Sequence, residues 1–261
     1  MDLGTVIGLA GGLTLIIVSI VLNGASLLWY ADIASFFAVF GGSFAALLIA
    51  NPISRALGVG NFIKLVFSVQ KSEKMAVISQ LQAFSEAARK EGLLSLDEKL
   101  DEIPDPFMRK AMRLVVDGGE AEAIRTILYT EIESMKLRHG KGIGFLQDWA
   151  SLAPAFGMIG TVQGLIQMMQ NLEDKASIGK GMAVALITTY YGALAANLIF
   201  TPMKRKLEER DKEEVTTREI IVEGCISILN GENPHILMQK LLSFLPPSER
   251  KAAEEEVEGK T

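Results

Sequence analysis

The sequence predicts an all-α integral membrane protein with four transmembrane helices, a helical cytoplasmic domain between the second and third of them, and a helical cytoplasmic C-terminal tail. The 261 residues are 49% hydrophobic with a mean hydropathy of +0.28, although 22% of them are charged. Of the 26 Lys and Arg residues, 14 lie in residues 55–141 and 10 in residues 204–260. The chain therefore meets both lipid and water, which excludes a wholly soluble globule and a disordered chain.

Four apolar runs without an ionisable side chain are long enough to be spans. About 20 apolar residues cross the roughly 30 Å hydrocarbon core as a helix. A spanning segment must also pair its own backbone groups, so each run is expected to be helical. The alternative is four buried helices of a large soluble bundle. Within the runs 3–31, 33–54, 150–172 and 181–203, the predicted spans are residues 5–22, 33–50, 151–170 and 181–200.

The basic residues predict the topology. The connection at residues 23–32 has no Lys or Arg, and the one at residues 171–179 has only Lys175. Basic residues instead flank the opposite ends of the spans, so the positive-inside rule places both termini and the long middle loop in the cytoplasm. The predicted divisions are a transmembrane hairpin (1–53), an interface helix with a cytoplasmic domain (54–148), a second hairpin (149–203) and a cytoplasmic helical tail with a disordered end (204–261).

Helical periodicity and turn residues predict the cytoplasmic elements. Residues 54–70 have the apolar and basic pattern of a helix at the membrane surface. Further helices are expected over 73–92, over 107–116 after Pro104-Asp105-Pro106, and from 120 toward the third span, loosened at Gly140, Gly142 and Gly144. The fourth span is expected to continue over 204–229 and to stop at Asn230-Gly231. A helix over 234–244 and a disordered end from Ser248 complete the prediction.

Composition also limits the chemistry. One Cys and two His residues cannot build a disulfide framework or a zinc site of ordinary ligand number. We find no phosphate-binding loop, nucleophile motif or basic stripe, so no cofactor, permanently bound metal, enzymatic activity or nucleic acid partner is expected. No ionisable residue lies within the four runs, so this chain alone lacks a titratable ion carrier at membrane depth.

The last two spans concentrate small and polar residues at helical spacing. The third has Pro154, Gly157, Thr161 and Gly164 on one face. The fourth has a matching series that ends with a proline: Gly181, Ala185, Thr188 or Thr189, Gly192, Ala196 and Pro202. Close helix packing and a polar pathway both explain such faces. The spacing leaves the two interpretations open.

Several motifs together resemble the MotA/PomA family of flagellar stator proteins. They are Leu-Ala-Pro-Ala-Phe-Gly-Met-Ile-Gly-Thr at 152–161 and Gly-Lys-Gly-Met-Ala-Val-Ala-Leu-Ile-Thr-Thr-Tyr-Tyr-Gly-Ala at 179–193, with Met1-Asp2-Leu3, Gly41-Gly42-Ser43 and the loop sequence at 88–97. The topology agrees over the whole chain. The resemblance implies the ring-forming subunit of an ion-driven torque generator in the bacterial inner membrane, a pentamer around a dimer of single-span MotB/PomB-type partners whose membrane Asp carries the ion.

The resemblance also assigns roles to residues. Pro154 and Pro202 match the prolines that couple ion passage to movement, and Thr161 and Thr189, with Thr188 beside them, match hydroxyls of the ion pathway. In the loop, Arg89, Lys90 and Asp97 match charges that engage the rotor protein FliG. The family has Glu where Asp97 stands, so Asp97 and Glu98 are both candidates. Without the resemblance these would be ordinary solvated charges.

The transported ion is Na⁺ or H⁺, and the sequence favours Na⁺. A dehydrated sodium ion needs several oxygen ligands, which Thr161 and Thr189 offer. The Thr in the third span is similar to sodium-type members, whereas proton-type members often have Ala there. The alternatives are an ExbB/TolQ-like energising channel subunit, which usually has three spans, and a non-conducting membrane scaffold.

Overall fold

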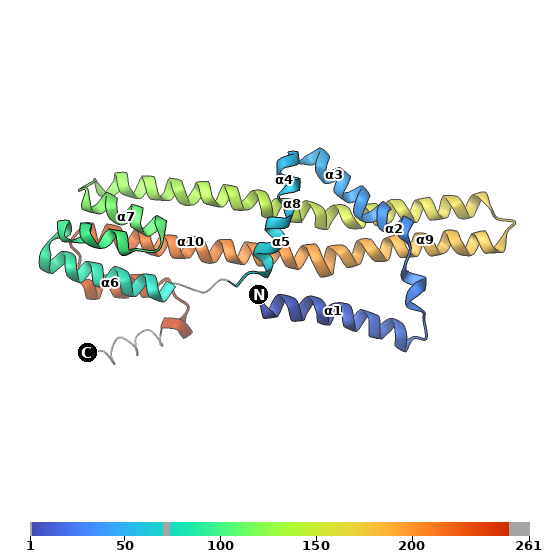
Figure 1. The fold of residues 1–261 in the computed structure, drawn as a ribbon, viewed down its shortest axis with the longest axis horizontal. Coiled ribbons are helices and arrows are strands. Elements are labelled where there is room, and N and C mark those ends of the chain that lie inside the picture. Colours follow the sequence, from blue (N-terminus) through green and yellow to red (C-terminus); the bar gives the residue numbers. More distant parts are fainter. Residues whose placement is uncertain (1, 70–73, 251–261) are drawn as a thin grey trace. The chain divides into compact units, whose positions relative to one another are not determined.

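The computed structural model describes residues 2–69 and 74–250, and the chain divides into two compact units. Met1–Val69 with His139–Glu209 form the first, which we call the membrane unit, and Gln70–Arg138 with Arg210–Thr261 form the second unit. The described residues form helices and turns, without a strand (Figure 1). Two long helices, α8 (Ala121–Gln170) and α10 (Thr201–Leu229), contribute residues to both units.

The membrane unit contains the four predicted spans. Four helical stretches are long and apolar enough to cross a membrane: Leu3–Leu22, Ile33–Ala50, Ala121–Gln170 and Lys175–Leu229. The all-helical membrane fold is thereby confirmed. The remaining bounds in this unit are α1 (Leu3–Leu22), η1 (Leu27–Tyr30), α2 (Ile33–Phe36), η2 (Phe37–Gly41), α3 (Gly42–Ala50), α4 (Ile53–Leu57), α5 (Val59–Phe67), α9 (Lys175–Leu194) and η4 (Ala195–Phe200). Both η2 and η4 are π-helical turns within a span.

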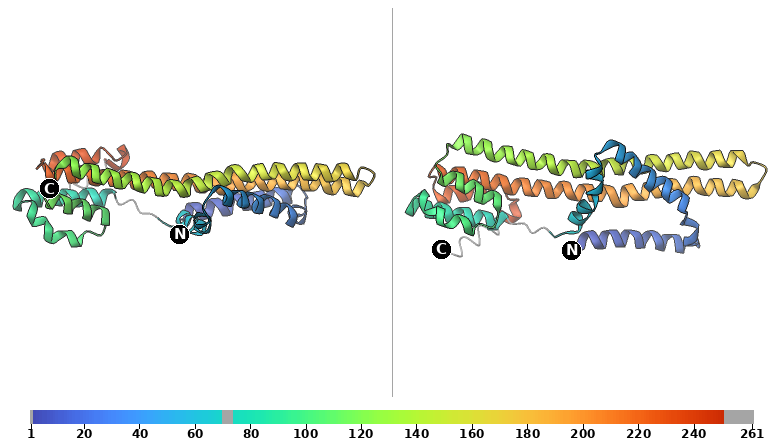
Figure 2. Two further views of the ribbon diagram at one scale, coloured as in Figure 1. Left: turned by 90° about the horizontal axis from the view of Figure 1, so that it is seen from above. Right: turned by 45° about the horizontal axis from the view of Figure 1, so that its top comes forward.

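The third and fourth spans approach each other through glycine, and Figure 2 keeps α8 and α9 side by side in both views. A Cβ atom on Gly164 would lie 2.5 Å from the carbonyl oxygen of Gly181, and one on Gly192 would lie 2.7 Å from that of Ala153. The two backbones are therefore in direct contact, as small residues allow in membrane helix pairs. Close packing accounts for these glycines.

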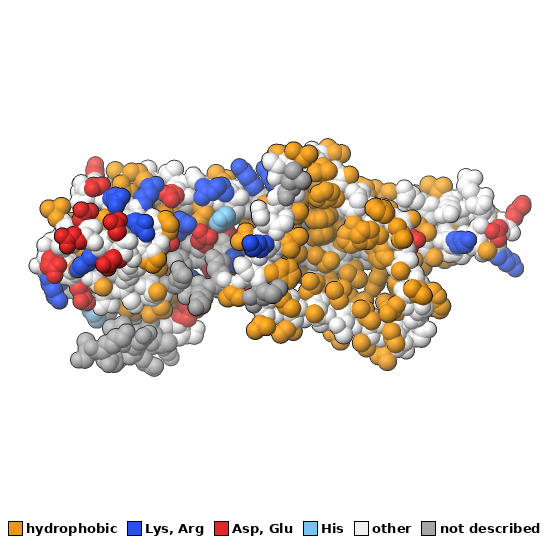
Figure 3. Space-filling model, in the orientation of Figure 1, with side chains coloured by type: hydrophobic (Ala, Val, Ile, Leu, Met, Phe, Trp, Pro, Cys, Tyr) orange, Lys and Arg blue, Asp and Glu red, His pale blue; other side chains and the backbone are white. Residues whose placement is uncertain are grey.

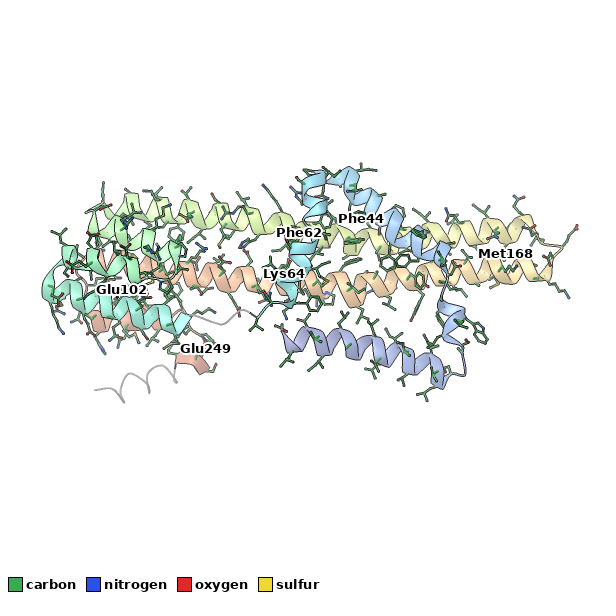
Figure 4. All side chains as sticks on the ribbon, in the orientation of Figure 1. Phe44, Phe62, Lys64, Glu102, Met168 and Glu249 are labelled. Carbon is green, nitrogen blue, oxygen red and sulfur yellow. The ribbon has the colours of Figure 1, made fainter. Side chains whose placement is uncertain are left out.

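The second span packs against α8 through polar and aromatic contacts. Trp149 donates its indole N–H to the hydroxyl of Ser43 at 3.1 Å. Its ring stacks on Phe200 with centroids 4.2 Å apart and lies 5.6 Å from the ring of Phe44, which Figure 4 labels. Trp149 thus joins α3 of the second span to the π-helical turn of the fourth.

Two helical segments differ from the sequence prediction: the one after the second span and the one that leads into the third span. The helix expected over 54–70 forms as α4 and α5, which divide at Gly58. The predicted loosening of the following helix at Gly140, Gly142 and Gly144 is wrong, because α8 is continuous there. A Cβ on Gly142 would lie 2.7 Å from the ring of Phe62 on α5 (labelled in Figure 4), so this glycine makes room for an aromatic side chain.

The second unit is a helical domain around one apolar core. Its further helices are α6 (Lys74–Glu91), η3 (Leu93–Glu102), α7 (Pro106–Val116) and α11 (Pro234–Leu242). The core includes Ile78, Leu81, Met112, Leu128 and Ile221. The predicted helices and the stop after Leu229 are confirmed, with Gly231 at a φ of 67°. Of the predicted disordered end, residues 248–250 are helical and residues 251–261 lie outside the described residues.

The membrane unit has an apolar surface and the second unit a charged one, as contact with lipid and with water requires. Figure 3 shows hydrophobic side chains spread over the face that α1, α2 and α3 present, whereas acidic and basic side chains are interspersed over α6 and α7. Exposed apolar residues of the spans include Leu15, Phe37, Ile49 and Leu186. Such a surface is stable in lipid, and in water it would be an aggregation site.

We expect Gly164→Ala to destabilise the membrane unit, because its Cβ would meet the backbone of α9 rather than a side chain that can move. Overpacking of this kind costs about 1–3 kcal/mol. Gly179→Ala is the matched control, since a Cβ there meets nothing within 4 Å. Thermal unfolding of the detergent-solubilised chain measures the difference, and equal midpoints for the two variants would contradict the packing analysis.

Candidate functional site

Two threonine hydroxyls meet between the third and fourth spans. Thr161 of α8 and Thr189 of α9 are hydrogen-bonded to each other through their side chains. The Thr161 hydroxyl also lies 3.1 Å from the carbonyl oxygens of Gly157 and Ala185, and the Thr189 hydroxyl lies 3.2 Å from that of Ala185. The structure thus brings two predicted pathway residues together. Their two hydroxyl oxygens and the two carbonyl oxygens form a cluster of four oxygen atoms.

These oxygen atoms carry more lone pairs than protons. Each hydroxyl has one proton, and a carbonyl oxygen has two lone pairs. The Ala185 carbonyl also accepts from the Thr188 hydroxyl at 3.1 Å, so three hydroxyls compete for it. All the short contacts cannot be proton-donating bonds at once. The cluster therefore has unused lone pairs, which suit a cation that binds oxygen.

Thr188 differs from the other two threonines. Its side chain is 1% exposed, and its hydroxyl donates to the carbonyl of Val184 at 2.9 Å within the same helix. A Cβ on Gly160 would lie 2.4 Å from its methyl group, so Thr188 fills the α8–α9 contact. Thr189, by contrast, is exposed at the surface of this chain. The role of Thr188 in an ion pathway stays a prediction, and its contacts are those of packing.

Pro154 lies two helical turns before Thr161 in α8. Proline has no amide hydrogen, so the carbonyl of Ala150 loses its helical donor and the helix is easier to bend there. The backbone of α9 comes close at this point, because a Cβ on Gly192 would lie 3.0 Å from the Cα of Pro154. Pro154 therefore lies in direct contact with the backbone of the fourth span.

Pro202 follows the π-helical turn η4 after one residue and lines a cavity of about 400 Å³. Because proline has no amide hydrogen, Pro202 donates no hydrogen bond to a carbonyl of the preceding turn. Turns of the π type often accompany functional sites in helices. The fourth span thus has two adjacent irregularities near its predicted cytoplasmic end. The cavity is lined by α1, α5 and the fourth span: Gly4, Thr5, Gly8, Leu9, Val66, Phe67, Leu198, Ile199, Pro202, Met203 and Lys206.

An ion pair lies at this cavity, and the sequence analysis missed it. Lys206 is 2.7 Å from the carboxylate of Asp2, which also accepts from the amide of Thr5 at 2.9 Å. The hydrogen bond from Lys206, with those from Thr5, holds the pKa of Asp2 below its usual range. Asp2 therefore stays ionised until the pH falls through this lowered pKa. An Asp before a span and a Lys after Pro202 were the available signals, but nothing in the spacing pairs them.

The predicted rotor-contact residues lie in the second unit, and all four are exposed. Arg89 and Lys90 end α6, and Asp97 and Glu98 lie in η3. Gly92 between these elements has a φ of 87°, which permits the tight turn. The structure therefore presents two basic and two acidic side chains on adjoining elements.

Within residues 2–69 and 74–250, no three His, Cys, Asp or Glu side chains are placed to hold a metal ion. The single cysteine, Cys225, is fully buried with its sulfur 3.5 Å from that of Met112. Burial raises the pKa of this thiol, so it stays protonated and unreactive. Cys225 is part of the hydrophobic core.

Comparison with known proteins gives one consistent family. Residues 99–220 match the MotA/TolQ/ExbB proton channel family. The chain is 45% identical to Motility protein A of Borreliella burgdorferi, with 96% of each chain covered, and 36% identical to Chemotaxis protein PomA of Vibrio alginolyticus, covering 96% of this chain and 98% of that one. The flagellar MotAB stator complex of Bacillus subtilis contains a chain that matches with a TM-score of 0.88 and 30% identity, covering 95% of this chain and 97% of that one.

We expect Thr188→Ala to lower the stability of the membrane unit and Thr189→Ala to leave it nearly unchanged. Removing the buried side-chain atoms of Thr188 opens a void against Gly160, which costs about 0.5–1.5 kcal/mol. Thr189 is exposed, and exposed substitutions usually stay within about 0.5 kcal/mol. Thermal unfolding in one detergent provides the test, and a larger loss for Thr189→Ala would reverse the assignment.

Proposed function

The chain belongs to the motility protein A group of the MotA/TolQ/ExbB family, as a stator subunit of the flagellar motor, and we propose that it conducts Na⁺ with a single-span partner and converts the ion flow into rotation. The observation that carries the proposal is the Thr161–Thr189 oxygen cluster between α8 and α9. This cluster lies in spans without an ionisable residue. Such spans can line an ion path but do not provide the charged carrier.

The carrier is therefore assigned to the partner. A MotB/PomB-type chain would place its membrane Asp beside Thr161 and Thr189, where the ion exchanges between carboxylate and hydroxyl oxygens. The relative from Bacillus subtilis is part of a MotAB complex, which supports a partner of this kind. We propose a pentameric ring of this chain around a dimer of the partner, in the bacterial inner membrane with both termini in the cytoplasm.

Sodium is preferred because of the number and kind of oxygen atoms. The hydroxyls of Thr161 and Thr189 lie 3.1–3.2 Å from the carbonyl oxygens of Gly157 and Ala185, close enough for these oxygen atoms to contact one cation. Oxygen dipoles of this kind replace the water that a metal cation loses on entering a pore. A proton needs no such ligand set.

The ion's energy is sufficient for a mechanical step. An ion that crosses the membrane releases about 2.3 kcal/mol per 100 mV, several times the thermal energy. Binding and release change the charge at the partner's Asp and hence its fit between the spans. Pro154 touches the fourth span at Gly192, and Pro202 weakens that span near its cytoplasmic end, so these prolines are placed to pass on the movement.

The second unit would deliver the movement to the rotor. Arg89, Lys90, Asp97 and Glu98 are exposed side chains of both signs, which suits a transient contact with a FliG-type protein of complementary charge. The alternatives remain an ExbB/TolQ-like energising subunit and a non-conducting scaffold. Four spans favour the stator over the ExbB/TolQ type, since that class usually has three.

We expect swimming driven by this chain and its partner to depend on external Na⁺, and Thr161→Ala to need a higher Na⁺ concentration for the same speed, because the ion loses one hydroxyl ligand. Swimming speed is measured against Na⁺ concentration at constant ionic strength in a motile host without its own A-type subunit. A Thr161→Ala variant that swims equally well without any Na⁺ dependence would contradict the sodium assignment. Swimming without the partner would contradict the assignment of the ion carrier to the partner. Absence of ion flux in the presence of the partner would favour a non-conducting scaffold.

We expect Arg89→Glu to reduce torque severalfold without reducing ion flux, because it reverses the charge offered to the rotor and leaves the membrane unit unchanged. Lys74→Glu is the matched control, at the other end of the same helix α6. Torque is measured from tethered cells, and flux in vesicles. Equal torque for the two variants, also when each is combined with a change at Lys90, would argue against this rotor contact.

A further inference from the structure

The first span is fastened to the fourth at the start of α1 by a set of polar contacts that we call the N-terminal latch: Asp2, Thr5, Phe67 and Lys206. The Asp2 carboxylate pairs with Lys206 at 2.7 Å and accepts from the Thr5 amide and hydroxyl at 2.9 and 3.0 Å. The Asp2 amide donates to the carbonyl of Phe67 at the end of α5, at 2.9 Å. One residue thus joins three helices.

A second contact fastens the same two spans farther along. A Cβ on Gly12 would lie 2.6 Å from the side chain of Leu198, so this leucine packs directly on the backbone of α1. Pro202 lies between the two attachments, four residues after Leu198 and four before Lys206. Between them is the cavity of about 400 Å³, in whose wall Pro202 and Gly8 lie.

Between these two attachments, α1 and the fourth span differ in their backbone hydrogen bonding. Helix α1 is an uninterrupted α-helix without proline over Leu3–Leu22, so the backbone hydrogen-bond ladder continues along the roughly 15 Å between the attachments, at 1.5 Å per residue, although four glycines lie in this segment. The opposite side contains the end of the π-helical turn η4 and Pro202, which interrupt the hydrogen-bond ladder. A helix with an unbroken ladder that is attached on both sides of an interruption in its neighbour opposes bending at that interruption.

We infer that Asp2 and Lys206 are positioning residues of the motor, which make α1 a splint across Pro202 and so fix how far the fourth span can bend there. The importance for torque rests on the proposed function. The splint itself rests on the contacts of α1 with the fourth span alone.

The latch is tested by disulfide formation across the cavity. Gly8→Cys and Met203→Cys place one thiol on α1 and one on α10 at the same cavity, and a Cβ at Gly8 meets nothing within 4 Å. The natural Cys225 is fully buried and gives no background. The rate is followed under a mild oxidant in membranes that contain the full chain with its partner, in otherwise unchanged protein and in latch variants.

Asp2→Asn keeps the cap of α1, because Asn caps helices as well as Asp does, and removes the charge that pairs with Lys206, while the hydrogen bond from Lys206 to the Thr5 hydroxyl remains. Lys206→Gln removes it from the other side, and Lys206→Arg retains the charge. We expect the first two to raise the cross-linking rate roughly two- to fivefold, as loss of one partly exposed ion pair allows, and Lys206→Arg to leave it unchanged. Glu208→Gln is the matched control, because the Lys204–Glu208 pair of 2.8 Å is similarly exposed but lies within one helix.

The same variants are then compared for torque at equal amounts of membrane-inserted protein. Lower torque in Asp2→Asn and Lys206→Gln, with Lys206→Arg and Glu208→Gln unaffected, supports the inference. Cross-linking rates that match Glu208→Gln would overturn the splint, and faster cross-linking with unchanged torque would overturn its role in the motor. If the unchanged chain drives no swimming, the proposed function fails, while the cross-linking rates still decide whether the latch holds the spans.

Discussion

The backbone contact between α8 and α9 is the constraint on which the rest of the membrane unit depends. Lipid provides little hydrophobic force between helices, so spans associate where small residues let their atoms approach closely. Gly157, Gly164, Gly181 and Gly192 supply this contact along most of the pair. The register that the glycines fix also sets Thr161 against Thr189 and Pro154 against Gly192. Packing and a polar site are therefore two results of one interface.

The first and second spans are attached to this pair by different kinds of contact. Helix α1 has no buried residue, and its contacts with the fourth span include one leucine on a glycine, the Asp2–Lys206 ion pair and a hydrogen bond from Lys206 to the Thr5 hydroxyl. The second span is held more firmly, by the Trp149–Ser43 bond and by Gly42, over which Phe156 packs. The second span is thus held by aromatic and polar side chains, whereas α1 is held to the fourth span on both sides of Pro202.

The fold was largely predictable because lipid imposes simple rules. Charge-free runs had to be helices of about 20 residues, and the ends near Leu22, Ala50 and Gln170 agree with the structure. The continuous course of α8 through Gly142 was not predictable, since glycine weakens an isolated helix and only the packing of Phe62 explains it. Among the candidate site residues, spacing placed Thr161 and Thr189 on suitable faces. It did not distinguish Thr189 from the buried Thr188, and long-range pairs such as Asp2 with Lys206 leave no periodic signal.

The π-helical turn η4 has an effect on the helix that contains it. A π turn holds one residue more than an α turn, so every residue after it is rotated by about 100° around the axis relative to an uninterrupted helix. Gly192, before the turn, faces α8, whereas Pro202 and Lys206, after it, face α1 and α5. The extra residue thus rotates the contacting face, so that the helix packs against α8 before the turn and against α1 and α5 after it. Deleting a single residue from 195–200 would shorten the span by one residue only, and yet turn the helix α10 that follows it away from the first span.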